Sequence, residues 1–411
     1  MKILQINATY GIGSTGFYTK VLHEKLKERG HESYVVTAAA DSSAEKDSDI
    51  FVAGGKFSRK INALRARLTG NQNSVADGVT KKIIEFIDAK APDVIQLGNI
   101  HANFVNFKKL LKYISKKNIA LIVVLHDCWF FTGKCTNYVD AGCLKWQKKC
   151  GDCPKIKDDI PSWLYDKTEA MLEEKKALFA GIKKLTVVGV SEKITEDAKK
   201  SYVFSGRNCI CIPNAVDDTI FFPGNEKSPE DDSSSTRTIV GAAAKWSMYK
   251  GIDDFIKLGE LCGSSFGDSV QIKLAGGFEH LGEDVKERLK KSNVQMLGCI
   301  TPEELATLYR GSDVFVSMSK GESFGCSISE AIMCGLPVVS YSGYAEGEIL
   351  RKNSNCYVVD NQKSVEKIFR YITRILNSDK GKKTKSGISD DYRPLDIGEY
   401  VEKFLTIYEE F

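Results

Sequence analysis

The sequence of 411 residues has no apolar run that approaches the roughly 20 residues needed to cross a bilayer as a helix. Its first residues, MKILQINATYG, also lack the charged-then-apolar layout of a signal peptide. The formal net charge of +4 is too small to indicate nucleic acid as a partner, so any basic binding site must be local. We therefore expect a cytoplasmic protein.

The composition is that of an ordinary globular protein with enough apolar residues for a large core. Hydrophobic residues make up 42% of the chain and charged residues 27%, and the length predicts two or three domains. The 12 cysteines, in a reducing compartment, are more often packed thiols or metal ligands than disulfides.

Two regions of the chain alternate short apolar strands with helices, which is typical of doubly wound α/β domains. In the first region, strands are expected at Lys2–Ile6, Glu32–Thr37, Val94–Leu97, Ala120–Leu125 and Leu185–Val190. In the second, they are expected at Ile239–Ala243, Val270–Ala275, Val294–Leu297, Val314–Met318 and Val338–Tyr341.

Two polar segments without periodicity, at 224–237 and 378–393, are predicted to be exposed loops or linkers. We expect two parallel-sheet domains, 1–222 and 223–394, the first carrying a cysteine-rich insertion at 128–154. A helix at 395–411 would follow and pack back on the first domain.

The stretch SKGESFGCSISEAIMCGLPVVS, residues 319–340, carries the strongest signal. It places Glu322 and Glu330 on either side of a Phe324-Gly325 turn, with a helix expected at Ser327–Cys334. Loops at the carboxyl ends of parallel strands bind ligands, and a helix amino terminus offers N–H groups to an anion. Because carboxylates accept hydrogen bonds from hydroxyls, a nucleotide sugar suits this arrangement. The alternative is a solvent-facing Glu on an ordinary helix.

Other polar residues and glycines also follow predicted strands. Lys245 and Lys250 come after one strand and could neutralise a departing pyrophosphate, although isolated lysines are more often surface residues. Strand-then-glycine patterns recur at 274–277 and 297–300, and a glycine-rich turn at 11–16 precedes a helix expected from about Phe17. That turn lacks the dinucleotide-binding spacing, but glycine lets backbone approach a ligand closely.

Two further motifs occupy the end of the strand Ala120–Leu125 and the insertion after it. His126 beside Asp127 at a strand carboxyl end is more often functional than a histidine within an apolar face. Four cysteines within nineteen residues suit a tetrahedral structural zinc, with a redox pair or unligated thiols as alternatives. These candidate ligands are Cys135, Cys143, Cys150 and Cys153.

The segment GGKFSRKINALRARLTG interleaves basic residues with apolar residues that recur every three or four positions. This pattern predicts a basic amphipathic helix over residues 56–68. Such a helix can lie on an anionic membrane surface, to which each basic residue contributes about 1 kcal/mol. The alternative is a solvated helix that packs its apolar stripe on the domain.

Taken together, these motifs resemble the retaining nucleotide-sugar glycosyltransferases of family 4, which have the GT-B fold. The similarity covers nearly the whole chain, and the block with Glu322 and Glu330 is its most specific part. It also rests on the glycine-rich first turn, the PNAVD segment from Pro213, the Lys250-Gly251 pair, the Leu-x-Gly-Gly strand end and the terminal helix. The HDCWFFTGKC and CGDCP motifs are similar, more loosely, to a subgroup that acts in bacterial surface-polysaccharide synthesis.

The resemblance implies two Rossmann-like domains facing a central cleft, the first for a saccharide or lipid-linked acceptor and the second for a UDP- or GDP-sugar. Catalytic candidates would be Glu322 near the donor sugar, Lys250 on the diphosphate and His126 near the reacting sugar. Glu330 would hold the ribose hydroxyls. Further donor-binding candidates would be Gly13, Gly16, Lys245, Gly276, Gly298, Cys299, Ile300, Phe324 and Gly325.

On this basis no cofactor is required for catalysis, and the enzyme could lie peripherally on the inner face of the plasma membrane. Two alternatives share the same architecture: a nucleotide-sugar 2-epimerase, which would convert the donor without an acceptor, and a non-catalytic nucleotide-sugar-binding subunit.

Overall fold

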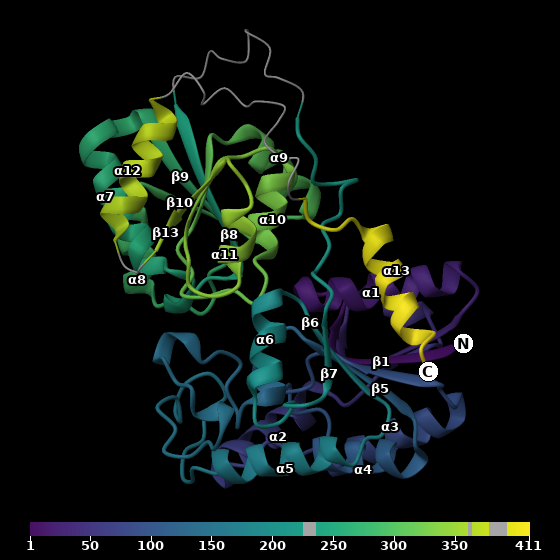
Figure 1. The fold of residues 1–411 in the computed structure, drawn as a ribbon. Coiled ribbons are helices and arrows are strands. Elements are labelled where there is room, and N and C mark those ends of the chain that lie inside the picture. The colour runs from purple at the N-terminus through teal and green to yellow at the C-terminus, as the bar shows by residue number, and fades with distance from the viewer. Residues whose placement is uncertain (225–235, 361–363, 378–392) are drawn as a thin grey trace. The chain divides into compact units, whose positions relative to one another are not determined.

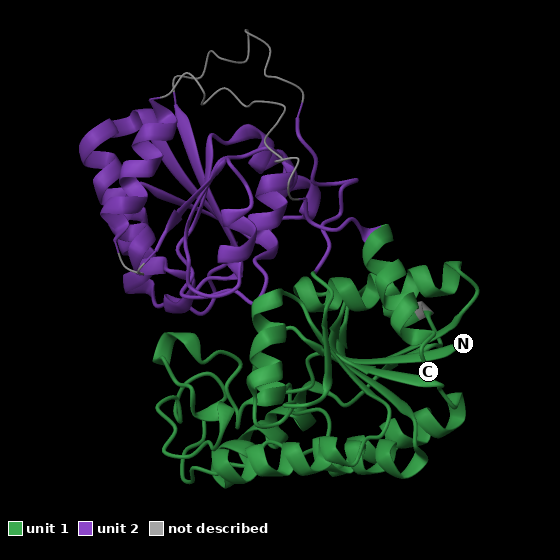
Figure 2. Ribbon diagram, in the orientation of Figure 1, with its two compact units in different colours: residues 1–213, 398–411 green, residues 214–397 purple. Residues whose placement is uncertain are grey.

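The computed structural model describes residues 1–224, 236–360, 364–377 and 393–411. The predicted polar segments at 224–237 and 378–393 lie almost entirely outside these residues. The chain forms two compact units, which are drawn in different colours in Figure 2. Unit 1 comprises 1–213 and 398–411, and unit 2 comprises 214–397.

Unit 1 is built on a parallel sheet of seven strands in the order β3-β2-β1-β4-β5-β6-β7. The strands are β1 (Lys2–Tyr10), β2 (Glu32–Ala40), β3 (Ile50–Val52), β4 (Val94–Leu97), β5 (Ala120–Leu125), β6 (Leu185–Gly189) and β7 (Asn208–Cys211). The helices are α1 (Gly13–Glu28), α2 (Lys56–Thr69), α3 (Asp77–Lys90), α4 (Phe107–Lys117), α5 (Thr168–Ala180), α6 (Glu192–Lys200) and α13 (Ile397–Tyr408). In Figure 1, α3, α4 and α5 cover one face of the sheet, and α1 and α13 cover the other.

Unit 2 has a parallel sheet of six strands in the order β10-β9-β8-β11-β12-β13. The strands are β8 (Arg237–Lys245), β9 (Val270–Gly277), β10 (Val294–Gly298), β11 (Val314–Ser317), β12 (Val338–Tyr341) and β13 (Cys356–Val359). The helices are α7 (Ile252–Phe266), α8 (Glu283–Lys291), α9 (Pro302–Gly311), α10 (Cys326–Met333), α11 (Glu346–Arg351) and α12 (Val365–Leu376). Helices α7 and α12 pack on one face and α9 and α10 on the other (Figure 1).

In both units the strand order runs outward in two directions from a pair of central strands. The reversal lies between β1 and β4 in unit 1 and between β8 and β11 in unit 2. The prediction of two doubly wound parallel-sheet domains is therefore confirmed. In such sheets, ligands bind at the carboxyl ends of the strands on either side of the reversal.

The junction of the units differs in detail from the expected boundary at residue 222. The segment from Asn214 to Pro223 belongs to unit 2, because its apolar and backbone groups pack there. The ring of Phe221 lies 6.2 Å from that of Tyr309, and Arg310 donates a hydrogen bond to the carbonyl of Ile220 at 3.1 Å.

Helix α13 completes unit 1 after the chain has passed through unit 2. Phe404 is fully buried, and the Tyr408 hydroxyl donates to the side-chain oxygen of Gln96 on β4 at 2.6 Å. The expected terminal helix is therefore part of the core of unit 1. None of the helices formed by the described residues is both long and apolar enough to span a bilayer.

Candidate active site

An ion pair joins the two loops at the strand reversal of unit 2. Lys250 follows β8 and Glu322 follows β11, and the Lys250 Nζ lies 2.6 Å from a Glu322 carboxylate oxygen. Their side chains are 30% and 22% exposed, so both can reach a ligand. The structure thus brings together two of the three residues predicted to be catalytic.

The close approach of these loops depends on the glycine that follows Lys250. Gly251 has a φ of +78°, and a Cβ at this position would lie 2.4 Å from the carbonyl oxygen of Met318. The Tyr249 hydroxyl donates to the carbonyl of Gly321 at 2.8 Å, and Lys320 N–H donates to the carbonyl of Tyr249 at 3.0 Å. Gly251 is therefore required for the close packing of the two loops, while Lys250 supplies a positive charge.

Glu346, which the sequence analysis missed, holds the Glu322 loop in place. Its carboxylate is 1% exposed and accepts hydrogen bonds from the backbone N–H groups of Glu322 and Tyr344, each at 3.0 Å, and of Gly343. In return, Ala345 N–H donates to the carbonyl of Glu322 at 3.1 Å. Burial outweighs these donors and raises the pKa of Glu346 to about 7.

Glu330 lies on α10, which begins immediately after Gly325. The side chain is half-buried, and desolvation raises its pKa to about 7. The described residues place no hydrogen-bond donor on its carboxylate. An unpaired, partly desolvated carboxylate is an acceptor for ligand hydroxyls. Phe324 is buried beneath the turn, so its backbone is the part that can contact a ligand.

The other predicted donor-binding residues of unit 2 follow neighbouring strands at the same edge of the sheet. Gly276 is the last residue but one of β9, Gly298 ends β10 and is followed by Cys299 and Ile300, and Lys245 is the exposed last residue of β8. Because all six strands are parallel, these residues share the edge that carries Lys250 and Glu322. The residues predicted from the sequence therefore lie along one continuous edge of the unit 2 sheet.

In unit 1, the glycine turn lies at the corresponding reversal, after β1. Gly11 N–H donates to the carbonyl of Gly16 at 2.9 Å, which closes the turn, and Gly13 begins α1 with open space around it. Asn7 supports the turn: its side-chain amide donates to the carbonyl of Thr9 at 2.7 Å and its oxygen accepts from Asn99 N–H at 2.7 Å. Asn7 was not singled out from the sequence.

His126 and Asp127 follow β5, as predicted, but they have different environments. Burial lowers the pKa of His126 to about 4, so its imidazole is neutral at neutral pH, and its ring stacks on that of Tyr18. Asp127 instead contacts His101, whose Nε2 lies 2.8 Å from its carboxylate. Burial opposes protonation of His101, but Asp127 outweighs it and raises the pKa of that imidazole.

The four predicted zinc ligands come together in the structure, and the zinc site itself stays a prediction. All four cysteines line one small cavity, but Cys135 is hydrogen-bonded to Cys153, and no group of three or more metal-binding side chains occurs among the described residues. Buried lysines also hold the insertion. The Lys134 Nζ donates to the carbonyls of Ile156, Asp158 and Ile160 at 3.2, 3.0 and 2.7 Å.

Comparison with known proteins assigns both units to related families. Residues 15–219 match the model described as Glycosyltransferase Family 4, and residues 225–388 match Glycosyl transferases group 1. The chain is 23% identical over 379 residues to a putative colanic acid biosynthesis glycosyl transferase, WcaC, of Escherichia coli, with 88% of each protein covered.

Solved structures show the same fold. Sucrose-phosphate synthase from Thermosynechococcus elongatus superimposes with a TM-score of 0.70 at 15% identity, covering 100% of this chain and 99% of that one. The Anabaena protein HepE, solved in complex with UDP and glucose, gives 0.65 at 15% identity and covers both chains fully. The chain therefore belongs to the group 1 glycosyltransferases of family 4 and has the GT-B fold.

Proposed function

We propose that this glycosyltransferase moves a sugar, with retention of configuration, from a UDP- or GDP-sugar to a saccharide acceptor carried on a lipid, in bacterial polysaccharide biosynthesis. The observation that carries the proposal is the accessible Lys250–Glu322 pair at the strand reversal of unit 2. Similarity to the putative colanic acid enzyme supports the polysaccharide assignment.

Each group at this edge has a part in the proposed reaction. The diphosphate leaves with developing negative charge, which Lys250 and the N–H groups of the first turn of α10 would stabilise. Glu322 would exchange its bond to Lys250 for the hydroxyls of the donor sugar. Glu330 would accept hydrogen bonds from the ribose hydroxyls, which suits a half-buried carboxylate without a protein donor among the described residues.

In unit 1, we propose that the turn carrying Gly13 and Gly16 and the imidazole of His126 serve the acceptor and the reacting sugar. Since the pKa of His126 is lowered to about 4, this side chain would act as a neutral hydrogen-bonding group. The ion pair of His101 with Asp127 would fix the start of the loop that follows β5.

Replacement of Lys250 or Glu322 by alanine tests the proposal. Release of nucleoside diphosphate in the presence of acceptor should fall about 100- to 1000-fold in either variant, because a group that stabilises transition-state charge is lost. The matched control is Glu366→Ala, which breaks the ion pair with Lys257 at 2.5 Å between α12 and α7 and removes none of the predicted donor-binding residues. Equal activity in Glu322→Ala and Glu366→Ala would contradict the assignment.

The same assay separates the alternatives. A glycosyltransferase releases the diphosphate only when acceptor is present, whereas a 2-epimerase converts the donor sugar without acceptor. A binding subunit would retain nucleotide binding, measured by thermal shift, and show no turnover with any donor and acceptor pair.

A further inference from the structure

Helix α2 packs a side of small and uncharged residues on unit 1 and exposes its apolar stripe. Phe57, Ile61, Leu64 and Leu68 form one stripe along the helix, and they are 77%, 38%, 46% and 39% exposed. The side that packs on unit 1 contains Asn62, whose amide donates to the carbonyl of Asn103 at 3.1 Å, and Ala66. The alternative, in which the apolar stripe packs on the domain, is therefore wrong.

A second segment extends the apolar stripe. Trp163, Leu164 and Tyr165 are 50%, 64% and 58% exposed. They lie beside the end of α2, because Trp163 N–H donates to the carbonyl of Arg67 at 2.8 Å and the Arg67 guanidinium lies 5.6 Å from the Trp163 ring centre. We call these three residues and the α2 stripe the apolar surface.

The apolar surface holds seven of the thirteen exposed large hydrophobic side chains found among the described residues. Exposed apolar side chains scattered singly need no explanation, but a cluster marks an interaction site. Trp and Tyr beside aliphatic residues are typical of the interface between lipid headgroups and acyl chains.

Cations predominate around the apolar surface, with Asp77 the acidic residue that lines a cavity shared with Phe57 and Arg65. Helix α2 carries five basic residues and no acidic residue: Lys56, Arg59, Lys60, Arg65 and Arg67. Lys167 adds a further cation 5.7 Å from the ring centre of Tyr165. A second copy of this chain, docked through the same surface, would bring these cations together, which disfavours a symmetric dimer. An anionic lipid surface complements both the charge and the apolar groups.

We infer that the apolar surface, formed by α2 and residues 163–165, docks unit 1 onto a bilayer that contains anionic lipids. The apolar stripe and the three loop residues enter the headgroup region, and the flanking lysines and arginines contact lipid phosphates. This inference does not depend on the transferase reaction, so its failure would leave the proposed function intact.

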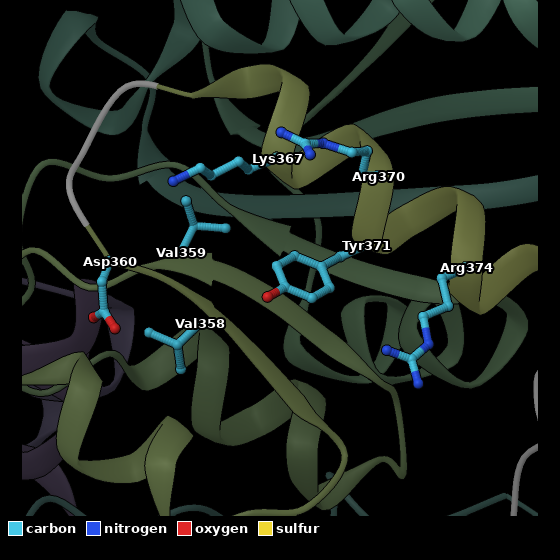
Figure 3. Close-up of a pocket in the computed structure, with 7 residues that line it drawn as sticks. All are labelled: Val358, Val359, Asp360, Lys367, Arg370, Tyr371 and Arg374. Carbon is cyan, nitrogen blue, oxygen red and sulfur yellow. The ribbon is translucent and has the colours of Figure 1, made fainter.

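Unit 2 provides a matched control surface. Lys367, Arg370 and Arg374 project from α12 beside the edge strand β13 and line a cavity with Tyr371 and Asp360 (Figure 3). These three cations have no exposed large hydrophobic neighbour on α12. Reversing them changes the net charge by the same amount as reversing three cations of α2.

Tryptophan fluorescence can locate the contact on the protein. Of the four tryptophans, Trp129, Trp146 and Trp246 are at most 2% exposed, so Trp163 alone can move from water into lipid. Binding to phosphatidylglycerol vesicles should shift the emission to shorter wavelength, and lipids brominated in the acyl chain should quench it. The variant Trp163→Phe should bind while losing this signal.

Flotation of the full chain with vesicles tests the inference. Vesicles of phosphatidylglycerol should bind the protein at least about tenfold better than vesicles of phosphatidylcholine. Phe57→Ser with Leu64→Ser, and the triple reversal Lys60→Glu, Arg65→Glu, Arg67→Glu, should each reduce binding by at least about tenfold. The reversal Lys367→Glu, Arg370→Glu, Arg374→Glu should leave binding unchanged.

The affected side chains are solvent-exposed or lie at the edge of the apolar surface, so the variants should keep the wild-type circular dichroism and unfolding midpoint. The inference is overturned if the wild type does not float, if it floats without a change in Trp163 emission, or if the α12 reversal reduces binding as much as the α2 reversal. Concentration-dependent self-association that Phe57→Ser abolishes without lipid would also overturn it, in favour of a contact between copies.

Discussion

The roles proposed for Lys250 and Glu322 concern the reaction, and neither residue should contribute much to stability. Their ion pair is partly exposed, and such pairs contribute at most about 1 kcal/mol. Substitution of either residue should therefore leave the unfolding midpoint nearly unchanged. A large loss of turnover in a stable variant would separate a binding role from a structural one.

Glu330 and Glu346 should make stability depend on pH. The pKa of each carboxyl is raised from 4.5 to about 7 by burial. Between these values the folded protein binds protons that the unfolded chain has released, so the free energy of unfolding falls as pH rises from 4.5 to 7. Each group should contribute roughly 1–3 kcal/mol to this decrease.

Urea unfolding at pH 4.5 and pH 7 measures this effect in the variant Glu330→Gln. The difference between the two pH values should be smaller in this variant than in the wild type. Glu303→Gln, an exposed position on α9, is the control and should retain the wild-type difference. A wild-type stability that rises over this interval would contradict the assignment.

At the scale of single elements, the strand ends of unit 2 are fixed by close backbone contacts. Gly276, at the end of β9, has a φ of +126°, and a Cβ there would lie 1.7 Å from the carbonyl oxygen of Ala243. The indole N–H of Trp246 donates to the carbonyl of Ala275 at 3.0 Å beside it. No side chain fits at this position without movement of β8.

Gly276→Ala should therefore lower the free energy of unfolding by at least about 2 kcal/mol. Gly263→Ala is the matched control, because Gly263 lies in α7 and a Cβ there meets nothing within 4 Å. This substitution should be neutral or stabilise by up to about 1 kcal/mol. Both variants are measured by thermal unfolding. Equal effects would show that the close approach of Gly276 to the Ala243 carbonyl does not determine which residue this position accepts.

The sequence was sufficient to locate most strands and the glutamate loops, because apolar periodicity and glycine position are local properties. Helix α10, for example, spans Cys326–Met333, one residue from the predicted Ser327–Cys334 at each end. Glu346 and His101 could not be predicted, because each depends on a partner that only the folded sheet brings near. The orientation of α2 was also undecided, since an amphipathic pattern does not say which side faces the protein.

At the scale of the whole molecule, the two units should respond to different perturbations. Phe404→Ala removes a fully buried ring of α13 in unit 1 and should cost about 3–5 kcal/mol. A nucleoside diphosphate that binds unit 2 should raise only the unfolding temperature of that unit.

Calorimetry of the full chain checks this division. Phe404→Ala should lower the temperature of one unfolding transition and leave that of the nucleotide-dependent transition unchanged. Lys403→Ala, at an exposed position on α13, should change neither temperature. A single transition that both perturbations shift equally would show that the units unfold as one cooperative body.

The route of the chain through unit 2 has a consequence for synthesis. Unit 1 needs α13, whose residues leave the ribosome after every residue of unit 2 has been made. Until then, Gln96 lacks the Tyr408 hydroxyl and the apolar groups that α13 covers remain open to water. During translation, unit 2 can therefore reach its native state while unit 1, although made first, still exposes surface that chaperones recognise.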